Sequence, residues 1–314
     1  MDFEQTAALM PSFLLPLLSE QYDEQRVHDI VEGYGAARLT TLRANTLLSD
    51  AEEVASALTQ AGIEYEKVTW YDDAFIILNA REKALWQLPV YQEGKIYLQS
   101  LSSMLPALAM QVKPQIDILD MCAAPGGKTT QMAALGKKGC HITACELNAP
   151  RAERLRFNLD KQGAGSVVVM KEDSRKLSDY FSFDQILLDA PCSGSGTLHA
   201  NDVKLHRRFT EALVAKSVKS QHALLEKALK LLKPGGTCVY STCSILEKEN
   251  ESVVKHCLDK ANKRGSYKLV NLNEQFSPES NNIPTLPTSL PEAICVAPTN
   301  RFEGFFMAKI KKES

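Results

Sequence analysis

Three kinds of signal are missing from this 314-residue sequence. No apolar run approaches the roughly 18 residues that a membrane span needs, and no basic segment followed by an apolar one opens the chain. We therefore expect neither a membrane span nor a secretory signal. The eight cysteines form no CxxC pair and no Cys/His spacing typical of zinc sites. We expect reduced thiols, no metal and a cytoplasmic location.

The charged residues are unevenly distributed along the chain. Residues 1–95 hold 7 Lys/Arg and 16 Asp/Glu, whereas residues 96–314 hold 29 and 22. The longer part is therefore the better candidate for contact with a polyanion, although most of its charges are expected on solvated helix faces. Hydrophobic residues make up 44% of the chain, an ordinary value for a globular protein, so a packed core is expected.

The first 95 residues indicate N-terminal helices and a small α+β domain. Apolar periodicity predicts two helices, over residues 4–19 and 23–35, and three later strands, over residues 39–47, 64–70 and 74–80. A further helix should separate the first of these strands from the second.

Local signals predict the connections within this domain. Ser49 and Glu52 form a capping box ahead of a helix that stops at Gly62. Asp72 and Asp73 mark the turn between the last two strands. Four aromatic residues of this region are candidates for stacking on bases: Trp70, Tyr71, Trp86 and Tyr91. Core packing is the favoured role for them.

From about residue 116 strands and helices alternate, which is the pattern of a parallel sheet. Five strands are predicted, over residues 116–122, 141–146, 167–173, 183–190 and 236–244. The helices between and after them are predicted to end at residue 135 and to cover residues 150–163, 211–233 and 246–264. Two final strands, 267–272 and 304–310, flank a segment rich in Pro, Ser and Asn (273–300) that we expect to be a loop or lid.

The turn after the first of these strands reads CAAPGGKTT (Cys122–Thr130), a place where α/β folds hold a small ligand. It is neither a P-loop, because Cys122 stands where that pattern needs glycine, nor a GxGxxG fingerprint. Glu146 ends the second strand and can bridge ribose hydroxyls, and Asp173 ends the third and could accept from an adenine amino group. These features fit S-adenosylmethionine, which has no phosphate, better than a dinucleotide. The alternative is that the acids only cap helices.

Two thiols follow the fourth and fifth strands. ILLDAPCSGSG (residues 186–196) runs from a buried strand into Asp189 and Cys192, because its proline cannot continue a ladder. The fifth strand ends in STCS, which contains Cys243. If these two strands are neighbours in the sheet, their ends lie about 5 Å apart, which would bring both thiols to one pocket. The alternative for the first stretch is a buried, inert cysteine beside a turn-forming Asp.

Two thiols and an acid beside a methyl donor indicate methylation at carbon-5 of a pyrimidine. This carbon becomes nucleophilic only after a thiolate has added to carbon-6 of the ring. An acid on the pyrimidine edge, here Asp189, must stabilise charge at the ring nitrogen, and a base must remove the carbon-5 proton before the thiol leaves. The spacing alone does not decide which cysteine attacks.

The chain resembles the RsmB/NOP2/Sun-domain family of RNA (cytosine-C5)-methyltransferases over roughly residues 40–310. The matching motifs are LRANTLL, YLQSLSSMLPALAM, LDMCAAPGGKTTQMA, ILLDAPCSGSGTL, VYSTCSILEKENE and GFFMAKI. The resemblance implies a class I S-adenosylmethionine-dependent methyltransferase domain (96–314), Rossmann-like α/β with a mostly parallel seven-stranded sheet. It also implies a preceding small RRM-like α+β domain within residues 1–95. Glu303 departs from the pattern, since many relatives have Asp there.

The same resemblance implies roles by position. Cys243 is implied as the nucleophile, Cys192 as the residue that assists product release, and Asp189 and Lys128 as further members of the catalytic centre. The implied S-adenosylmethionine-binding residues are Cys122, Ala123, Ala124, Pro125, Gly126, Gly127, Lys128, Glu146, Arg151, Asp173 and Asp189. No metal is implied.

The implied substrate is ribosomal or transfer RNA, and we expect a monomer. The best candidates for phosphate contact are four residues beyond the active-site loop: Lys204, His206, Arg207 and Arg208. A solvated surface is the alternative role for them. Two other functions stay open: a methyltransferase acting on another substrate, and a non-catalytic RNA-binding factor in ribosome assembly. A DNA cytosine enzyme would use Cys192 as its nucleophile, so the STCS motif disfavours it.

Overall fold

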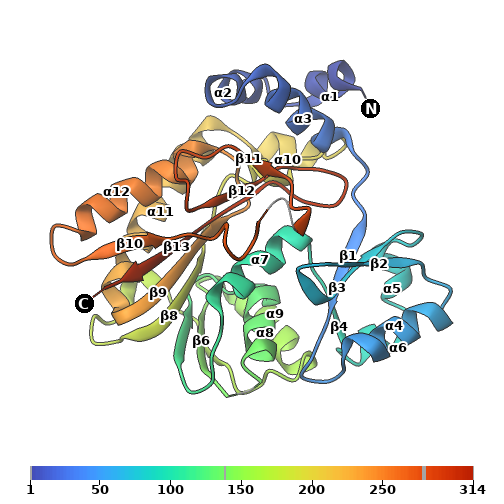
Figure 1. The fold of residues 1–314 in the computed structure, drawn as a ribbon, viewed down its shortest axis with the longest axis horizontal. Coiled ribbons are helices and arrows are strands. Elements are labelled where there is room, and N and C mark those ends of the chain that lie inside the picture. The colour runs from blue at the N-terminus through green and yellow to red at the C-terminus, as the bar shows by residue number, and fades with distance from the viewer. Residues whose placement is uncertain (1, 138, 278–280, 314) are drawn as a thin grey trace.

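The computed structural model describes residues 2–137, 139–277 and 281–313. These residues form N-terminal helices and two β-sheets (Figure 1). The smaller sheet has four strands in the order β2-β3-β1-β4. The larger sheet has nine strands in the order β11-β12-β13-β9-β8-β5-β6-β7, with β10 paired to β13.

Three helices open the described chain: α1 (Phe3–Leu9), α2 (Leu14–Gln21) and α3 (Glu24–Gly35). The single helix predicted over residues 4–19 is wrong, because Pro11 favours extended backbone at Met10, whose φ and ψ are −75° and 154°. Buried side chains of α2 and α3, such as Leu18 and Ile30, belong to the core of the larger sheet. The N-terminal helices therefore pack with the larger sheet.

The small domain is built on an antiparallel sheet. Its strands are β1 (Thr40–Ala44), β2 (Tyr65–Val68), β3 (Tyr71–Ile77) and β4 (Ile96–Leu98). Its helices are α4 (Ala51–Gln60), α5 (Glu82–Leu85) and α6 (Pro89–Gln92). The predicted strand–helix–strand–strand order is confirmed. Because β4 pairs with β1, this sheet extends past residue 95, and the domain division at that residue stays a prediction.

Two local predictions in the small domain are wrong. Asp50 caps α4 instead of Ser49, and its carboxylate accepts from two N–H groups of the first turn at 2.8 and 3.0 Å. The helix begins directly after Asp50, so this residue holds the capping position. The turn between β2 and β3 comes before the buried Tyr71, so Asp72 and Asp73 lie within β3.

The larger sheet carries the predicted βα alternation. Its parallel strands are β5 (Asp117–Asp120), β6 (His141–Cys145), β7 (Val168–Met170), β8 (Phe183–Asp189) and β9 (Leu232–Thr242). Antiparallel strands extend it beyond β9: β10 (Tyr267–Val270), β11 (Thr285–Leu286), β12 (Ile294–Val296) and β13 (Phe305–Lys312).

Helices cover this sheet and lie in the connections between its strands. The α-helices are α7 (Leu101–Met110), α8 (Gly127–Leu135), α9 (Ala149–Lys161), α10 (Val203–Arg208), α11 (Glu211–Leu231) and α12 (Glu251–Ala261). Three short 3-10 helices are η1 (Ser174–Lys176), η2 (Ser195–Thr197) and η3 (Glu247–Glu249). The helix predicted over residues 246–264 is thus divided into η3 and α12.

The predicted number of strands in the larger sheet is wrong, since its described part has nine rather than seven. Both β11 and β12 lie in the segment 273–300, which the sequence predicts to be a loop or lid. β12 is fully buried and pairs with β13 through Ile294 and Met307. Its three-residue apolar run is too short to stand out in a Pro/Ser/Asn-rich segment. Residues 278–280 of the predicted loop lie outside the described residues.

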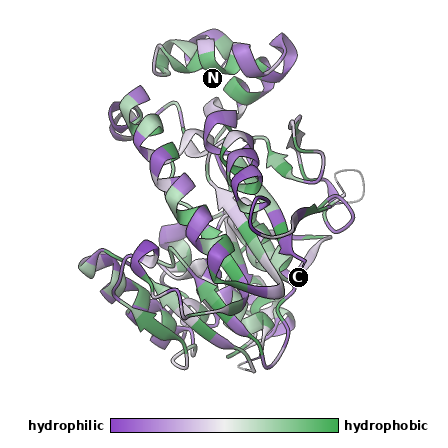
Figure 2. Cartoon of the chain, turned by 90° about the vertical axis from the view of Figure 1, so that its left-hand side faces the viewer, coloured by the Kyte–Doolittle hydropathy of each residue, from purple (hydrophilic) through white to green (hydrophobic). Residues whose placement is uncertain are grey.

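Apolar side chains cover both faces of the larger sheet. Ile186 and Leu188 of β8 belong to one buried cluster, and Leu187 belongs to another. Successive side chains of a strand point to opposite faces, so the ILL run suits a strand that is covered on both sides. Figure 2 shows helices with purple and green faces around strands in which green predominates. None of the helices in the described ranges has the length and apolar character of a membrane crossing.

Candidate active site

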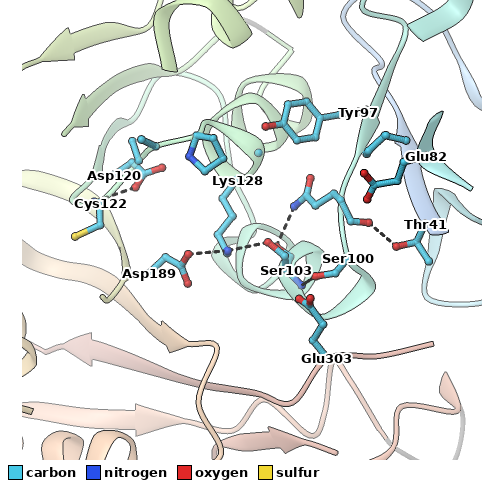
Figure 3. A pocket seen from close by; sticks show the side chains of 16 residues that line it. Thr41, Glu82, Tyr97, Ser100, Ser103, Asp120, Cys122, Lys128, Asp189 and Glu303 are labelled. Atoms are coloured by element: carbon cyan, nitrogen blue, oxygen red, sulfur yellow. Dashed lines mark hydrogen bonds and ion pairs between the residues drawn. The ribbon is translucent and has the colours of Figure 1, made fainter. Parts of the chain in front are cut away.

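The predicted site residues gather at the carboxyl ends of the parallel strands, where open α/β sheets bind ligands. Two cavities lie there, with volumes of about 360 and 570 Å³. Cys122 lines both cavities, so they are neighbours. The smaller cavity lies between the two sheets, because Thr41 and Tyr97 of the small sheet line it together with Asp189 of β8 (Figure 3).

The glycine turn after β5 forms part of the smaller cavity. Gly126 has a φ of +111°, which glycine adopts readily and other residues rarely do, and α8 starts directly after it. Asp120, at the end of β5, accepts hydrogen bonds from the Thr129 hydroxyl at 2.7 Å and from the Cys122 N–H at 3.4 Å. Burial raises the pKa of the Asp120 carboxyl to about 6. A buried carboxyl therefore connects the two ends of the turn.

Lys128 and Asp189 form an ion pair in the smaller cavity (Figure 3). The Lys128 Nζ donates to Asp189 Oδ2 at 2.7 Å and to Ser103 Oγ at 2.8 Å. The Ser241 hydroxyl of β9 donates to Asp189 Oδ1 at 2.8 Å. The side chains of Lys128 and Asp189 are 12% and 29% exposed, so the pair is shielded and still reachable from the cavity. Such charge-assisted hydrogen bonds fix the position of the carboxylate.

Sequence reasoning missed several cavity residues. Thr41, Glu82, Tyr97, Ser103 and Glu303 line the smaller cavity, and Figure 3 shows them around Lys128. Tyr97 and Ser103 lie in the motif YLQSLSSM, which matched the family pattern and carried the available signal. Glu303 directly precedes the GFF motif.

The larger cavity contains the predicted cofactor residues that lie outside the glycine turn: Glu146, Arg151 and Asp173. Glu146 Oε1 accepts from the Asn148 N–H at 2.8 Å, and its other oxygen lies 3.4 Å from Arg151 Nη2. Both oxygens of Asp173 accept from the Arg175 guanidinium, at 2.7–3.1 Å. These hydrogen bonds hold the pKa of Asp173 below its usual value. The predicted acceptor for adenine is thus already engaged by a neighbouring side chain.

The side chains that line the two cavities suit S-adenosylmethionine as a ligand. A ribose presents hydroxyl groups, for which carboxylate oxygens are suitable acceptors. Glu146 is 5% exposed, and within the described residues its second oxygen makes only the longer contact with Arg151. The exposed Leu147 adds apolar surface to the same cavity.

Cys192 and Cys243 meet just past the ends of β8 and β9. Their sulfur atoms lie 3.1 Å apart, and both thiols are free. The hydrogen bond with Cys243, followed by desolvation, raises the pKa of the Cys192 thiol well above its usual value. The structure therefore brings the two predicted thiols together. They lie beside the two cavities, whose lining includes Asp189 and Pro191 but neither thiol.

Backbone contacts join the loops that carry the two thiols. The Gly196 N–H donates to the Cys243 carbonyl at 3.0 Å, and the Gly304 N–H donates to the Gly196 carbonyl at 2.8 Å. A Cβ atom on Gly196 would lie 1.9 Å from the Gly304 carbonyl oxygen. No side chain fits at this position without movement of the backbone.

We expect Gly196→Ala to lower the free energy of unfolding by about 3 kcal/mol, because the added methyl group must displace a backbone carbonyl. Urea unfolding followed by circular dichroism measures the change. Gly165→Ala is the matched control, since a Cβ there meets only Asp160 Oδ1 at 3.7 Å. Equal effects of the two substitutions would contradict the close approach of Gly196 to the Gly304 carbonyl.

The predicted RNA contacts lie on α10 and in the small domain. Lys204, Arg207 and Arg208 are exposed, and the His206 ring contacts the His199 carbonyl oxygen at 2.9 Å. Their role in binding RNA stays a prediction. Among the aromatic residues, Tyr71 is buried, Trp70 and Tyr91 are half-buried, and Trp86 is 41% exposed. Core packing is thus confirmed for Tyr71.

The fold is that of a class I methyltransferase. A solved structure of a methyltransferase homolog protein from Pyrococcus horikoshii superposes with a TM-score of 0.83 and 31% identity. The match covers 99% of this chain and 98% of that one. The fold class predicted from the sequence is therefore confirmed.

The chain belongs to the 16S rRNA methyltransferase RsmB/F family, whose model matches residues 107–311. A second model, the ferredoxin-like domain of RsmF/B-like methyltransferases, matches residues 10–82 and confirms the α+β domain. The chain is 34% identical over 249 residues to ribosomal RNA small subunit methyltransferase F of Shewanella amazonensis, covering 78% of this chain and 53% of that protein. It is 32% identical over 307 residues to the human 28S rRNA (cytosine(4447)-C(5))-methyltransferase, covering 96% and 38%. The chain thus spans about half the length of such relatives, or less.

Proposed function

We propose that this protein is an S-adenosylmethionine-dependent methyltransferase that forms 5-methylcytosine in RNA. The observation that carries the proposal is the thiol pair, with Cys192 and Cys243 sulfurs 3.1 Å apart at the ends of adjacent strands. A methyltransferase fold alone does not require two thiols there, whereas addition to a pyrimidine requires at least one. Membership of the family and the names of its rRNA-modifying relatives support the same reaction.

Cys243 is the nucleophile in this proposal. Its thiolate adds to carbon-6 of the target cytosine and makes carbon-5 electron-rich. S-adenosylmethionine, when bound, supplies an electrophilic methyl group. A base then takes the proton from carbon-5, the bond between sulfur and carbon-6 breaks, and its electron pair returns to Cys243 as the ring double bond reforms. Cys192 assists the release step in this proposal, since its sulfur lies 3.1 Å from that of Cys243.

The ion pair of Lys128 and Asp189 would meet the polar edge of the cytosine. From the smaller cavity, this carboxylate and ammonium would stabilise the charge that develops at the ring nitrogen. Three residues from the small sheet and α7 border the same cavity, namely Thr41, Tyr97 and Ser103. The target base must leave its stack to reach this position.

The larger cavity and the glycine turn would hold the cofactor. Glu146 would accept from the ribose hydroxyls. The turn from Cys122 to Lys128 would contact the remainder of the molecule, and Arg151 would brace this turn through its 2.8 Å hydrogen bond to the Ala124 carbonyl. Asp173 would share its carboxylate between Arg175 and the adenine amino group.

Ribosomal RNA is the substrate that the names of the relatives favour, with transfer RNA as the alternative. The basic residues of α10 would contact phosphates, which makes binding dependent on salt. The monomeric state and the cytoplasmic location stay predictions. The rival functions are a methyltransferase with another substrate and a non-catalytic assembly factor. The second would not need a thiol pair, an ion pair and a cofactor-type donor set in one place.

Bisulfite sequencing of total RNA from cells with and without the gene tests the proposal. We expect one or a few cytosines to lose methylation in the deletion strain and to regain it when purified protein and S-adenosylmethionine are added to that RNA. A methylated base other than cytosine would establish a different substrate. RNA binding without any methyl transfer would support the assembly factor instead.

A further inference from the structure

Glu249 lies at the end of η3, between the two loops that carry the thiols, and is fully buried. We infer that Glu249 is a positioning residue that holds Cys192 and Cys243 side by side through the serine that follows each of them. This inference deepens the proposed function and rests on it. The sequence predicts no function for Glu249, although the residue lies in the segment VYSTCSILEKENE.

The carboxylate of Glu249 is shared between the two loops. Its Oε1 accepts from the Ser193 N–H at 2.7 Å, and its Oε2 accepts from the Ser193 hydroxyl at 2.5 Å. The same Oε2 accepts from the Ser244 hydroxyl at 2.6 Å. Gln221 of α11 adds a longer hydrogen bond of 3.4 Å to Oε1. Since Ser193 follows Cys192 and Ser244 follows Cys243, one carboxylate fixes the backbone next to both thiols.

Asn250 extends this contact to the other side of Cys243. Its Oδ1 accepts from the Thr242 hydroxyl at 2.5 Å, and its Nδ2 donates to the Ser244 carbonyl at 2.9 Å. Both neighbours of Cys243 are therefore held by two consecutive buried residues, Glu249 and Asn250.

A nonpolar side chain could not replace this buried carboxylate without loss of hydrogen bonds. A buried charged group is costly unless hydrogen bonds compensate it, and four donors surround Glu249. A nonpolar side chain could fill the space but would leave the two serine hydroxyls and a backbone N–H without this acceptor. Covalent catalysis depends on placement, since a shift of about 1 Å can reduce the rate by about 100-fold.

The charge of Glu249 also affects the pKa of the Cys192 thiol. Among the described residues, the titratable groups that act on the Cys192 thiol are Cys243, just past β9, and Glu249 from η3. The hydrogen bond with Cys243 and desolvation raise the pKa of Cys192 most, and the charge of Glu249 raises it further.

Three variants of the full chain test the inference. Glu249→Ala removes the acceptor. Glu249→Gln keeps its shape and the acceptor for the Ser193 N–H, while both serine hydroxyls can turn to accept from the new amide. Glu251→Gln is the matched control, because Glu251 is a buried glutamate two residues further on, in α12, outside the contacts that Glu249 makes with Ser193 and Ser244.

Methylation kinetics provide the first measurement. We expect Glu249→Ala to lower kcat by about 100-fold with KM for RNA within about threefold of wild type, because binding surfaces stay in place while the thiols shift. Glu249→Gln should recover most of this loss, and Glu251→Gln should match wild type. A kcat for Glu249→Ala within threefold of the Glu251→Gln value would overturn the inference.

Thiol titration provides the second measurement and does not depend on RNA. Alkylation of Cys192 by iodoacetamide, followed by mass spectrometry across pH, is compared in Cys243→Ser and Cys243→Ser/Glu249→Gln. We expect the midpoint to fall by about one pH unit in the double variant, since a negative charge near the thiolate is lost. An unchanged midpoint would show that the Glu249 carboxylate is not held next to the Cys192 loop, which would contradict the inference even if Glu249→Ala does not fold. If wild-type protein makes no 5-methylcytosine, the proposed function fails, whereas this titration still decides whether Glu249 acts on Cys192.

Discussion

Cys243→Ala is expected to abolish methyl transfer to RNA, with a loss of about 1000-fold or more, because carbon-5 of cytosine is unreactive until a thiolate has added to carbon-6. Transfer of tritium from labelled S-adenosylmethionine to RNA measures the effect. Cys243 is partly exposed just past the end of β9, and its sulfur lies 3.1 Å from that of Cys192.

Cys238→Ala is the matched control for this experiment. Cys238 lies in the same strand, five positions earlier, and is fully buried. We expect its replacement to leave the rate within a few-fold of wild type. Residual methyl transfer in Cys243→Ala near the wild-type rate would exclude Cys243 as the nucleophile.

Cys192→Ala is expected to trap the protein on its RNA. Attack by Cys243 and methyl transfer should still occur, whereas release should slow, so a covalent protein–RNA adduct accumulates. The adduct is measured as a band of reduced mobility in denaturing gels that nuclease treatment removes. We expect multiple turnover to fall by about 100-fold or more, while a single turnover still labels the RNA.

The two cysteine variants together decide the roles. An adduct in Cys192→Ala that disappears in the double variant with Cys243→Ala would confirm the order of events. If Cys243→Ala formed the adduct and Cys192→Ala did not, the assignment would be reversed. The short separation of the sulfurs makes this control necessary, since either thiol lies close to the other's position.

The sequence predicts the centre of the fold well, because its signals are local. The apolar run of β8 and the glycine turn before α8 are each made of consecutive residues, and both occur where predicted. Strands such as β4 and β12 are three residues long, too short for periodicity to reveal them. The position of β4 depends on pairing with β1, which is distant in sequence, and that of β12 on pairing with β13, about ten residues further on.

The candidate site follows the same division. The residues that were predicted lie in motifs, such as Asp189 and Cys243, and their meeting follows from the order of neighbouring strands. The residues that were missed act over long sequence separations: Ser103 meets Lys128, and Glu249 meets Ser193. The engagement of Asp173 by its neighbour Arg175 is a matter of side-chain conformation, which periodicity and motif spacing do not encode.

The attachment of the N-terminal helices to the larger sheet has a consequence for the freedom of the small domain. Tyr34 of α3 donates to the Ser195 carbonyl at 2.8 Å, and Arg38 donates to the carbonyls of Gly196 and Leu198. The chain then enters the small sheet and returns to the larger body at α7. The small domain is therefore a segment tethered at both ends, which limits the orientations it can sample. Folding has already restricted the orientation of the two bodies relative to each other. RNA binding between them would therefore cost little further conformational entropy.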